Sequence, residues 1–279
     1  MSVLEKALQM LEKHALCDHC LGRQFALLGY DVENDERGNA IKLLLTLNAH
    51  TLALSKNKDG VKILKILATN GFFKPAEKIL QILQKMKRRI PRKSFPEKCY
   101  LCEDKFRRLD DLAKKALEKL GSYEFTNFLV GIELPVDVEE REDEFKAKFD
   151  VNFGENMRNE FGRAIGKKIV EYSGKNVEYR KPELVVLVNP ITEDVKLQVN
   201  PLYIAGRYKK LARGIPQSKW LCSNCRGKGC EKCNWTGKMY QESVEEIIGK
   251  PILDVTGGAE VSFHASGRED IDARMLGEG

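Results

Sequence analysis

All eight cysteines of this 279-residue chain occur in four Cys-x-x-Cys pairs. The pairs are Cys17/Cys20, Cys99/Cys102, Cys222/Cys225 and Cys230/Cys233. Disulfides are rare in intracellular proteins, and two such pairs supply the four thiolates of a tetrahedral zinc site. The cysteines therefore predict two zinc ions. Their role is expected to be structural, because a closed four-ligand site leaves no open position for catalysis.

The last two pairs lie in the segment CSNCRGKGCEKC, which carries four cysteines within 12 residues. Its small residues allow backbone N–H groups to approach the sulfurs. We expect a zinc knuckle over residues 220–238, with an interleaved ligand arrangement as one possibility. The competing interpretation is a set of redox-active or unligated thiols.

The first two pairs are separated by 78 residues, so the sequence does not show that they meet. They flank one helical segment. The simplest hypothesis is one shared zinc ion that clamps the ends of this segment together. His19 lies inside the first pair and is an alternative ligand, although a polar loop residue is the simpler interpretation.

The hydrophobic pattern changes along the chain. Apolar residues at three- and four-residue steps predict helices over 2–16, 34–54, 61–71, 75–90 and 109–121. Strands are predicted at 127–135, 183–190 and 195–204, and a further helix at 155–174. The order of these elements after residue 121 indicates an α+β domain, and another unit begins near residue 239.

Charge is distributed unevenly over a chain whose net charge is +6. Residues 207–238 hold nine Lys or Arg and one acid, and residues 137–144 are acidic. A second basic cluster comprises Lys85, Lys87, Arg88, Arg89, Arg92 and Lys93. Such clustering is typical of nucleic-acid binding.

The basic segment also carries aromatic residues that can stack on exposed bases. We expect phosphate contacts from Arg207, Lys209, Lys210, Arg213 and Lys219. Tyr208 and Trp220 are candidates for stacking, whereas Tyr203 is expected in the core. The alternative is a solvated face with core aromatics.

No apolar run reaches the length of a membrane-spanning helix, and the N-terminus MSVLEKALQM mixes charged with apolar residues, unlike a secretory signal. We expect a soluble, cytoplasmic protein that has no membrane partner and acts as a monomer.

Long motifs resemble one family. The segments FGENMRNEFGRAIGKKI and PELVVLVNPITEDVKLQVNPLYIAGRYKKLARGIPQSKW resemble the THUMP-like RNA-binding region of archaeal-type tRNA pseudouridine synthases. The start CDHCLGR, the four cysteine pairs and the closing SGREDIDARMLG are similar to the same family. The resemblance covers nearly the whole chain. It implies that the substrates are tRNA uridines 54 and 55 of the TΨC arm, isomerised without a redox or nucleotide cofactor.

The resemblance also implies an α+β multidomain fold. The expected parts are a helical zinc-binding accessory region (1–120), a THUMP-like RNA-binding domain (121–219), the zinc knuckle (220–238) and the start of an incomplete α/β pseudouridine synthase domain (239–279).

Pseudouridine synthesis breaks a glycosidic C–N bond and rejoins the base through carbon. An ionised carboxylate is a suitable nucleophile, and the base must leave its stack. A related branch of these enzymes carries its aspartate in a G-R-x-D segment, which Gly267-Arg268-Glu269-Asp270 matches. The resemblance thus implies Asp270 as the catalytic residue, with Asp272 as the alternative. Arg268 is expected to orient a phosphate or a neighbouring acid. Without the resemblance, a solvated loop is the simpler interpretation.

Other features expected in that family's catalytic domain, including its tyrosine and the basic partner of the aspartate, have no match in these 279 residues. We therefore expect a fragment that binds tRNA without isomerising uridine. The alternatives are a stand-alone tRNA-binding adaptor and another THUMP-containing tRNA enzyme. The second alternative would need a nucleotide-binding motif, and the sequence contains neither GxGxxG nor a P-loop.

Overall fold

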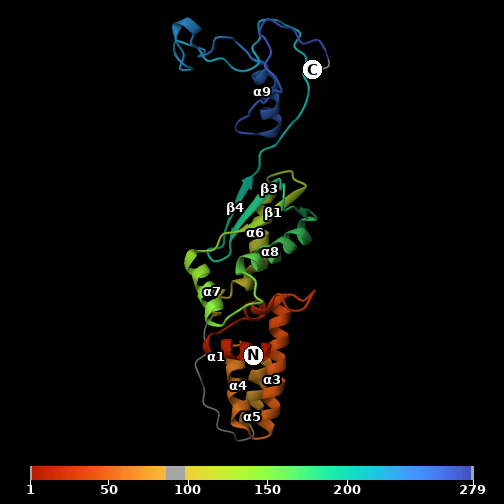
Figure 1. Cartoon of the computed structure of the whole chain (residues 1–279), viewed down its shortest axis with the longest axis vertical. Coiled ribbons are helices and arrows are strands. Elements are labelled where there is room, and N and C mark those ends of the chain that lie inside the picture. The colour runs from red at the N-terminus through yellow and green to blue at the C-terminus, as the bar shows by residue number, and fades with distance from the viewer. Residues whose placement is uncertain (1, 86–97, 278–279) are drawn as a thin grey trace. The chain divides into compact units, whose positions relative to one another are not determined.

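The structure is a computed structural model that describes residues 2–85 and 98–277 (Figure 1). The chain forms two compact units, Met1–Leu202 and Tyr203–Gly279. Residues 203–219 were expected at the end of the THUMP-like domain, but they lie in the second unit together with the cysteine knuckle. In the predicted basic cluster at 85–93, Lys85 ends a helix, and the other members lie outside the described residues.

Helices form the N-terminal part of the first unit. They are α1 (Val3–Lys13), α2 (Asp18–Gly22), η1 (Arg23–Phe25), α3 (Asn34–Leu54), α4 (Lys58–Thr69) and α5 (Lys74–Lys85). Helix α1 begins with a capping box between Ser2 and Glu5 and buries Ala7, Met10 and Leu11. The predicted helix at 34–54 is confirmed.

One charged residue of α3 lies in the interior. The Nζ of Lys42 donates to the carbonyls of Leu16 (2.9 Å) and Gly71 (2.7 Å) and lies 2.7 Å from the Asp18 carboxylate. The side chain is fully buried. Three partners replace the water lost on burial, so this ammonium joins the helices around α3.

The second part of this unit combines helices with a sheet. Its elements are η2 (Lys105–Arg108), α6 (Leu109–Leu120), β1 (Asn127–Ile132), α7 (Val136–Lys148), α8 (Met157–Ser173), β2 (Asn176–Val177), β3 (Leu184–Asn189) and β4 (Asp194–Val199). The strand order is β2-β1-β3-β4. Strand β1 is parallel to β2 and β3, whereas β3 and β4 are antiparallel. The three predicted strands are confirmed at their cores.

Helices α6 and α8 pack against each other and against the sheet. On β3 the buried residues Leu184, Val186 and Val188 alternate with partly buried ones, as expected for a strand with one face on a core. Because α6 covers the sheet, the expected boundary at residue 120 separates elements that share one core.

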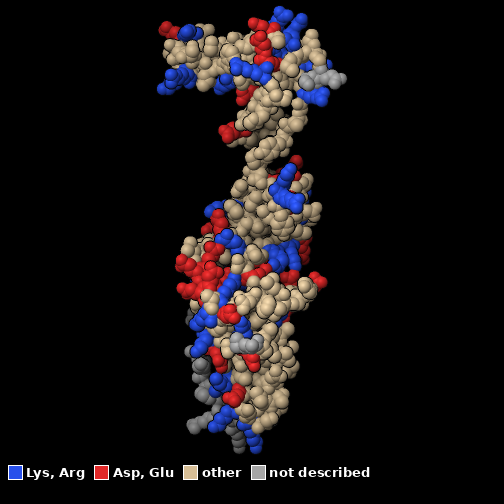
Figure 2. Space-filling view, viewed as in Figure 1, with Lys and Arg blue, Asp and Glu red and all other residues tan. Residues whose placement is uncertain are grey.

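Helix α7 was not predicted, because the segment is highly charged and shows little helical periodicity. Val138 and Phe145 are its buried apolar anchors, and Glu142 is buried between them. Of the other acidic residues, Asp137, Glu140, Asp143 and Glu144 are exposed, and Figure 2 shows a red patch over this helix. Burial of Val138 and Phe145 in the tertiary structure is enough to stabilise the helix.

The second unit has little regular structure. It contains η3 (Glu231–Cys233) and α9 (Val244–Thr256), which begins with Ser243 as N-cap. Within residues 239–277 no strand is formed, so the α/β character expected there is not seen. Among the described residues, no helix is both long and apolar enough to cross a membrane.

Candidate active-site loop and two cysteine clusters

The first two cysteine pairs converge. The sulfurs of Cys17, Cys20, Cys99 and Cys102 all lie within 4.8 Å of one another. Cys17 is the N-cap of α2, and its backbone N–H donates to the Cys99 sulfur at 3.3 Å. The backbone N–H of Tyr100 donates to the carbonyl of Ala15 at 2.7 Å, which holds the two segments side by side. The hypothesis of one shared four-cysteine site is therefore consistent with the geometry.

A buried ion network surrounds this cluster. Arg23 donates to Glu142 (3.1 Å), to Glu160 (2.8 Å) and to the sulfur of Cys20 (3.6 Å). Both carboxylates are almost fully buried, and the Arg23 side chain is fully so. Burial opposes the charge of Arg23, but Cys20, Glu160 and Glu142 together raise its pKa. The network joins the cysteine cluster to α7 and α8.

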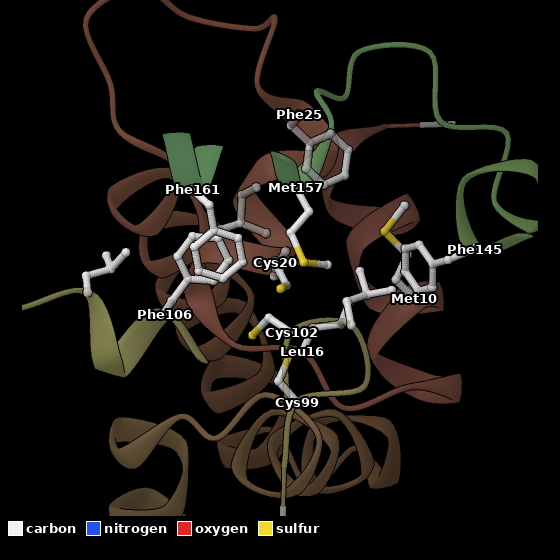
Figure 3. Packing of buried hydrophobic residues seen from close by; sticks show 14 of the residues in the cluster. Met10, Leu16, Cys20, Phe25, Cys99, Cys102, Phe106, Phe145, Met157 and Phe161 are labelled. Atoms are coloured by element: carbon white, nitrogen blue, oxygen red, sulfur yellow. The ribbon is translucent and has the colours of Figure 1, made fainter. Parts of the chain in front are cut away.

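His19 belongs to this network rather than to the metal-ligand group. Its Nδ1 lies 2.8 Å from Glu160, and its ring stacks on Phe106 with the centroids 4.4 Å apart. Phe106 stacks in turn on Phe161 at 3.9 Å. Figure 3 shows these two phenylalanines beside the cysteines. The stack of His19, Phe106 and Phe161 thus connects the first cysteine cluster to the hydrophobic core of the sheet layer.

The last two pairs form a second compact cluster. The sulfurs of Cys222, Cys225, Cys230 and Cys233 also lie within 4.8 Å of one another. Sulfur separations are 3.9 Å for Cys222–Cys230 and 3.7 Å for both Cys225–Cys233 and Cys230–Cys233. The segment closes through a backbone hydrogen bond of 2.8 Å from Cys222 to Gly237.

Backbone amides point at the sulfurs of this knuckle. Cys233 accepts from the N–H groups of Cys230 (3.2 Å) and Gly237 (3.3 Å), and Cys225 accepts from Gly229 (3.2 Å). Burial opposes ionisation of Cys233, but the amides of Cys230 and Gly237, together with the Cys225 and Cys230 side chains, lower its pKa to about 6. Gly237 has a φ of +72°, and an added Cβ would lie 2.5 Å from the Gly227 oxygen. Only glycine fits there.

Both groups fit zinc. Four sulfurs about 2.3 Å from one ion at tetrahedral angles are about 3.8 Å apart. The sulfur separations in the knuckle agree with this value, and Cys17–Cys102 measures 3.6 Å. Amide and guanidinium hydrogen bonds to sulfur stabilise thiolates, as around structural zinc. Bound zinc would supply no chemistry beyond cross-linking these segments, since all four ligand positions are taken.

Most of the predicted phosphate contacts lie on the surface of the second unit. Arg207, Lys209, Arg213 and Lys219 are exposed. Tyr203 is 88% exposed, so its expected place in the core is wrong. Trp220 is partly buried and packs edge-on against Tyr240 at 5.6 Å.

Lys210 does not match its predicted role. It is only 4% exposed. Its ammonium donates to the carbonyls of Ile215 (2.9 Å), Asp270 (2.9 Å) and Ile271 (3.1 Å). A phosphate contact requires a free donor at the surface, and these carbonyls use the three donors of the ammonium. We therefore remove Lys210 from the expected phosphate-binding set.

The predicted catalytic aspartate lies on a loop beside Lys210. Asp270 and Asp272 are both exposed, as is Arg268. The chain turns at Asp270, whose carbonyl accepts from the N–H of Ala273 at 3.2 Å. The loop contains no strand between residues 267 and 272.

Sequence reasoning missed the polar contacts beneath this loop. Gln217 donates from Nε2 to the carbonyl of Gly267 (2.8 Å) and to the Tyr208 hydroxyl (3.2 Å). Burial raises the pKa of Tyr208, Gln217 opposes the shift, and Glu269 adds to it. The sequence gives no signal that YKKLARGIPQ and SGRED meet, because their spacing along the chain does not reveal a contact between them.

Two known protein families match this chain, one in each of its two units. The family described as "Pus10 THUMP domain, archaeal" matches residues 112–189. The family described as "Pus10, C-terminal" matches residues 203–279. These ranges agree with the division of the chain at residues 202 and 203.

The chain is also similar to curated proteins named tRNA pseudouridine synthase Pus10. It is 38% identical to the protein of Methanothrix thermoacetophila over 99% of this chain and 58% of that protein. It is 40% identical to the protein of Methanocaldococcus jannaschii over 97% of this chain and 58% of that protein. The Methanococcus voltae protein is 48% identical over 66% of this chain and 36% of its own length. The chain thus spans less than two thirds of the length of these relatives.

Proposed function

Since the chain belongs to the Pus10 family of tRNA pseudouridine synthases, we propose that it binds tRNA and carries the nucleophile that isomerises uridine to pseudouridine. The proposed nucleophile is Asp270. The observation that carries the proposal is the backbone of the Asp270 loop, which side-chain hydrogen bonds from Lys210 and Gln217 hold while the carboxylate stays exposed. A solvated terminal loop has no need of such support.

An exposed carboxylate suits this chemistry. Isomerisation breaks the bond between ribose C1′ and uracil N1 and forms one between C1′ and C5, with no net change in atoms. A carboxylate that attacks the sugar or the base can hold the intermediate while the base turns. The proposal needs the target nucleotide outside its base stack, where Asp270 can reach it.

The proposed RNA-binding residues of the second unit are Arg207, Lys209, Arg213, Lys219 and Arg268. All are exposed, and all but Arg268 belong to the basic segment at residues 207–238. Cations at the surface neutralise phosphates and release counterions, so binding is expected to weaken as salt rises. The archaeal THUMP match at residues 112–189 supports a tRNA contact from the first unit as well.

We propose uridines 54 and 55 of the TΨC arm as the targets. The support is the resemblance of the long motifs and the closing SGREDIDARMLG to enzymes of that specificity. The two four-cysteine groups are proposed to hold structural zinc, one in each unit.

A tRNA-binding adaptor is the alternative function. An adaptor would not require an ordered aspartate, whereas the Asp270 loop is anchored at Gly267, Asp270 and Ile271. The two functions differ in one measurement. The chain extended to the full length of its relatives, called the intact protein below, is incubated with transcribed tRNA, and pseudouridine is mapped at single-nucleotide resolution. Modification at 54 and 55 that disappears in Asp270→Asn supports the enzyme, and tRNA binding without modification by the intact protein supports the adaptor.

A further inference from the structure

Lys210 and Glu269 lie together beneath the loop that carries Asp270. Lys210 is 4% exposed, and the side chain of Glu269 is 8% exposed. The Lys210 Nζ lies 3.7 Å from Glu269 Oε1. We propose that this buried ion pair positions Asp270 for reaction, so that both members are positioning residues of the isomerisation. The inference rests on the function proposed above.

The hydrogen bonds of Lys210 are all to backbone. Its three donors meet the carbonyls of Ile215, Asp270 and Ile271 at 2.9, 2.9 and 3.1 Å. Two of these acceptors belong to the proposed nucleophile and the residue after it. The ammonium therefore fixes the peptide planes on both sides of the Ile271 Cα, and the first of these planes begins at the Asp270 Cα.

Glu269 supplies charge to Lys210 rather than a hydrogen bond. Within the described part of the chain, neither of its carboxylate oxygens has a hydrogen-bond partner, and both are shielded from solvent. This follows from the geometry at Lys210, whose three donors are already used. Three neutral carbonyls do not balance a buried positive charge, so the nearby carboxylate compensates it.

Backbone contacts tie the same two segments together on either side of the pair. Lys210 and Met275 exchange hydrogen bonds of 3.1 and 2.8 Å, and the Gly214 N–H donates to the Ile271 carbonyl at 3.0 Å. Gln217 holds the Gly267 carbonyl at 2.8 Å. The segment from 208 to 217 is thus a platform for the loop from 267 to 275.

The experiment separates positioning from folding and from RNA binding. In the intact protein, Lys210→Met removes the contacts to the loop but leaves Glu269 buried without its counter-charge. The double variant Lys210→Met/Glu269→Gln removes both charges. Lys250→Met replaces an exposed lysine of the same unit, outside the basic segment, and serves as the matched control.

We expect the double variant to regain most of the Tm that Lys210→Met loses, yet to remain about 100-fold slower than wild type in single-turnover isomerisation. A displacement of the reacting group by about 1 Å costs a factor of this order. The Kd for tRNA should stay within about twofold, since both side chains are buried. Hydrogen exchange at the Gly214 and Met275 amides should accelerate in the double variant and not in Lys250→Met.

Two results would overturn the inference. One is a double variant that isomerises uridine at the wild-type rate. The other is unchanged exchange at Gly214 and Met275, which would show that the pair does not hold the loop. Asp270→Asn is run in parallel: if it is active, the proposed function itself fails, whereas an inactive Asp270→Asn beside a fully active double variant rejects only the positioning role.

Discussion

Arg23 and Glu160 are joined by a hydrogen bond of 2.8 Å between side chains that are almost completely buried, although they are 137 positions apart in the chain. Arg23 follows the first cysteine pair, and Glu160 lies in α8, which packs on the sheet. The same guanidinium contacts Glu142 of α7 and the Cys20 sulfur. One side chain therefore couples the cysteine cluster, α7 and the sheet layer of the first unit.

Arg23→Met is expected to destabilise this unit strongly. Removing the guanidinium leaves two buried carboxylates without their main counter-charge, which costs about 3–5 kcal/mol when one partner of a buried pair is lost. Urea unfolding should show the change in the free energy of unfolding. Lys62→Met is the control: Lys62 pairs with Glu12 at 3.2 Å on the surface, and such a pair contributes about 0–1 kcal/mol. Equal effects of the two substitutions would contradict the buried network.

The cysteine geometry predicts two zinc ions per chain. Cys20→Ser and Cys233→Ser should each reduce the zinc content from two to one, as measured by elemental analysis of protein purified without chelator. Cys20→Ser should lower the Tm of the first unit, because its site joins segments about 80 residues apart. Retention of two ions by either variant would show that its cysteine is not a ligand.

Exposed cations of the second unit should control the salt dependence of tRNA binding. For Lys209→Met/Arg213→Met, the slope of log Kd against log salt should decrease by about 2, since each lost phosphate contact removes about 1. Filter binding at several salt concentrations measures this slope. Lys210→Met should leave the slope unchanged, because its ammonium is occupied by carbonyls. A smaller slope for Lys210→Met would return that residue to the RNA surface.

The two exposed aspartates of the loop should differ in function. Asp270→Asn is expected to lower the single-turnover rate of isomerisation in the intact protein by about 1,000-fold or more, because the amide is not a nucleophile. Asp272→Asn should retain most of the rate. Tritium release from labelled uridine in tRNA gives both rates, and the reverse order would assign the reaction to Asp272.

Much of the first unit was predictable because its information is local. The helix at 34–54 and the strands β1, β3 and β4 follow from apolar spacing within each segment. Helix α7 was missed because its sequence has few apolar positions. Its two buried apolar side chains, Val138 and Phe145, stabilise the helix only through the core that they contact. The predicted domain boundary at residue 120 separates α6 from the sheet on which it packs. The reason is similar, since the sequence of α6 resembles that of the preceding helices.

By itself the sequence determined the chemistry that the chain carries: eight thiols in pairs suited to metal, a basic segment, and an aspartate in a G-R-x-D motif. Only the tertiary structure decided which of these groups meet. It brought Cys17 and Cys20 to Cys99 and Cys102, and it turned Lys210 inward to the Asp270 loop. The physical reason is that residue type and spacing set local conformation and charge, whereas burial depends on partners far along the chain. A lysine at the surface binds phosphate, but the same lysine in the interior must satisfy its donors with protein oxygen.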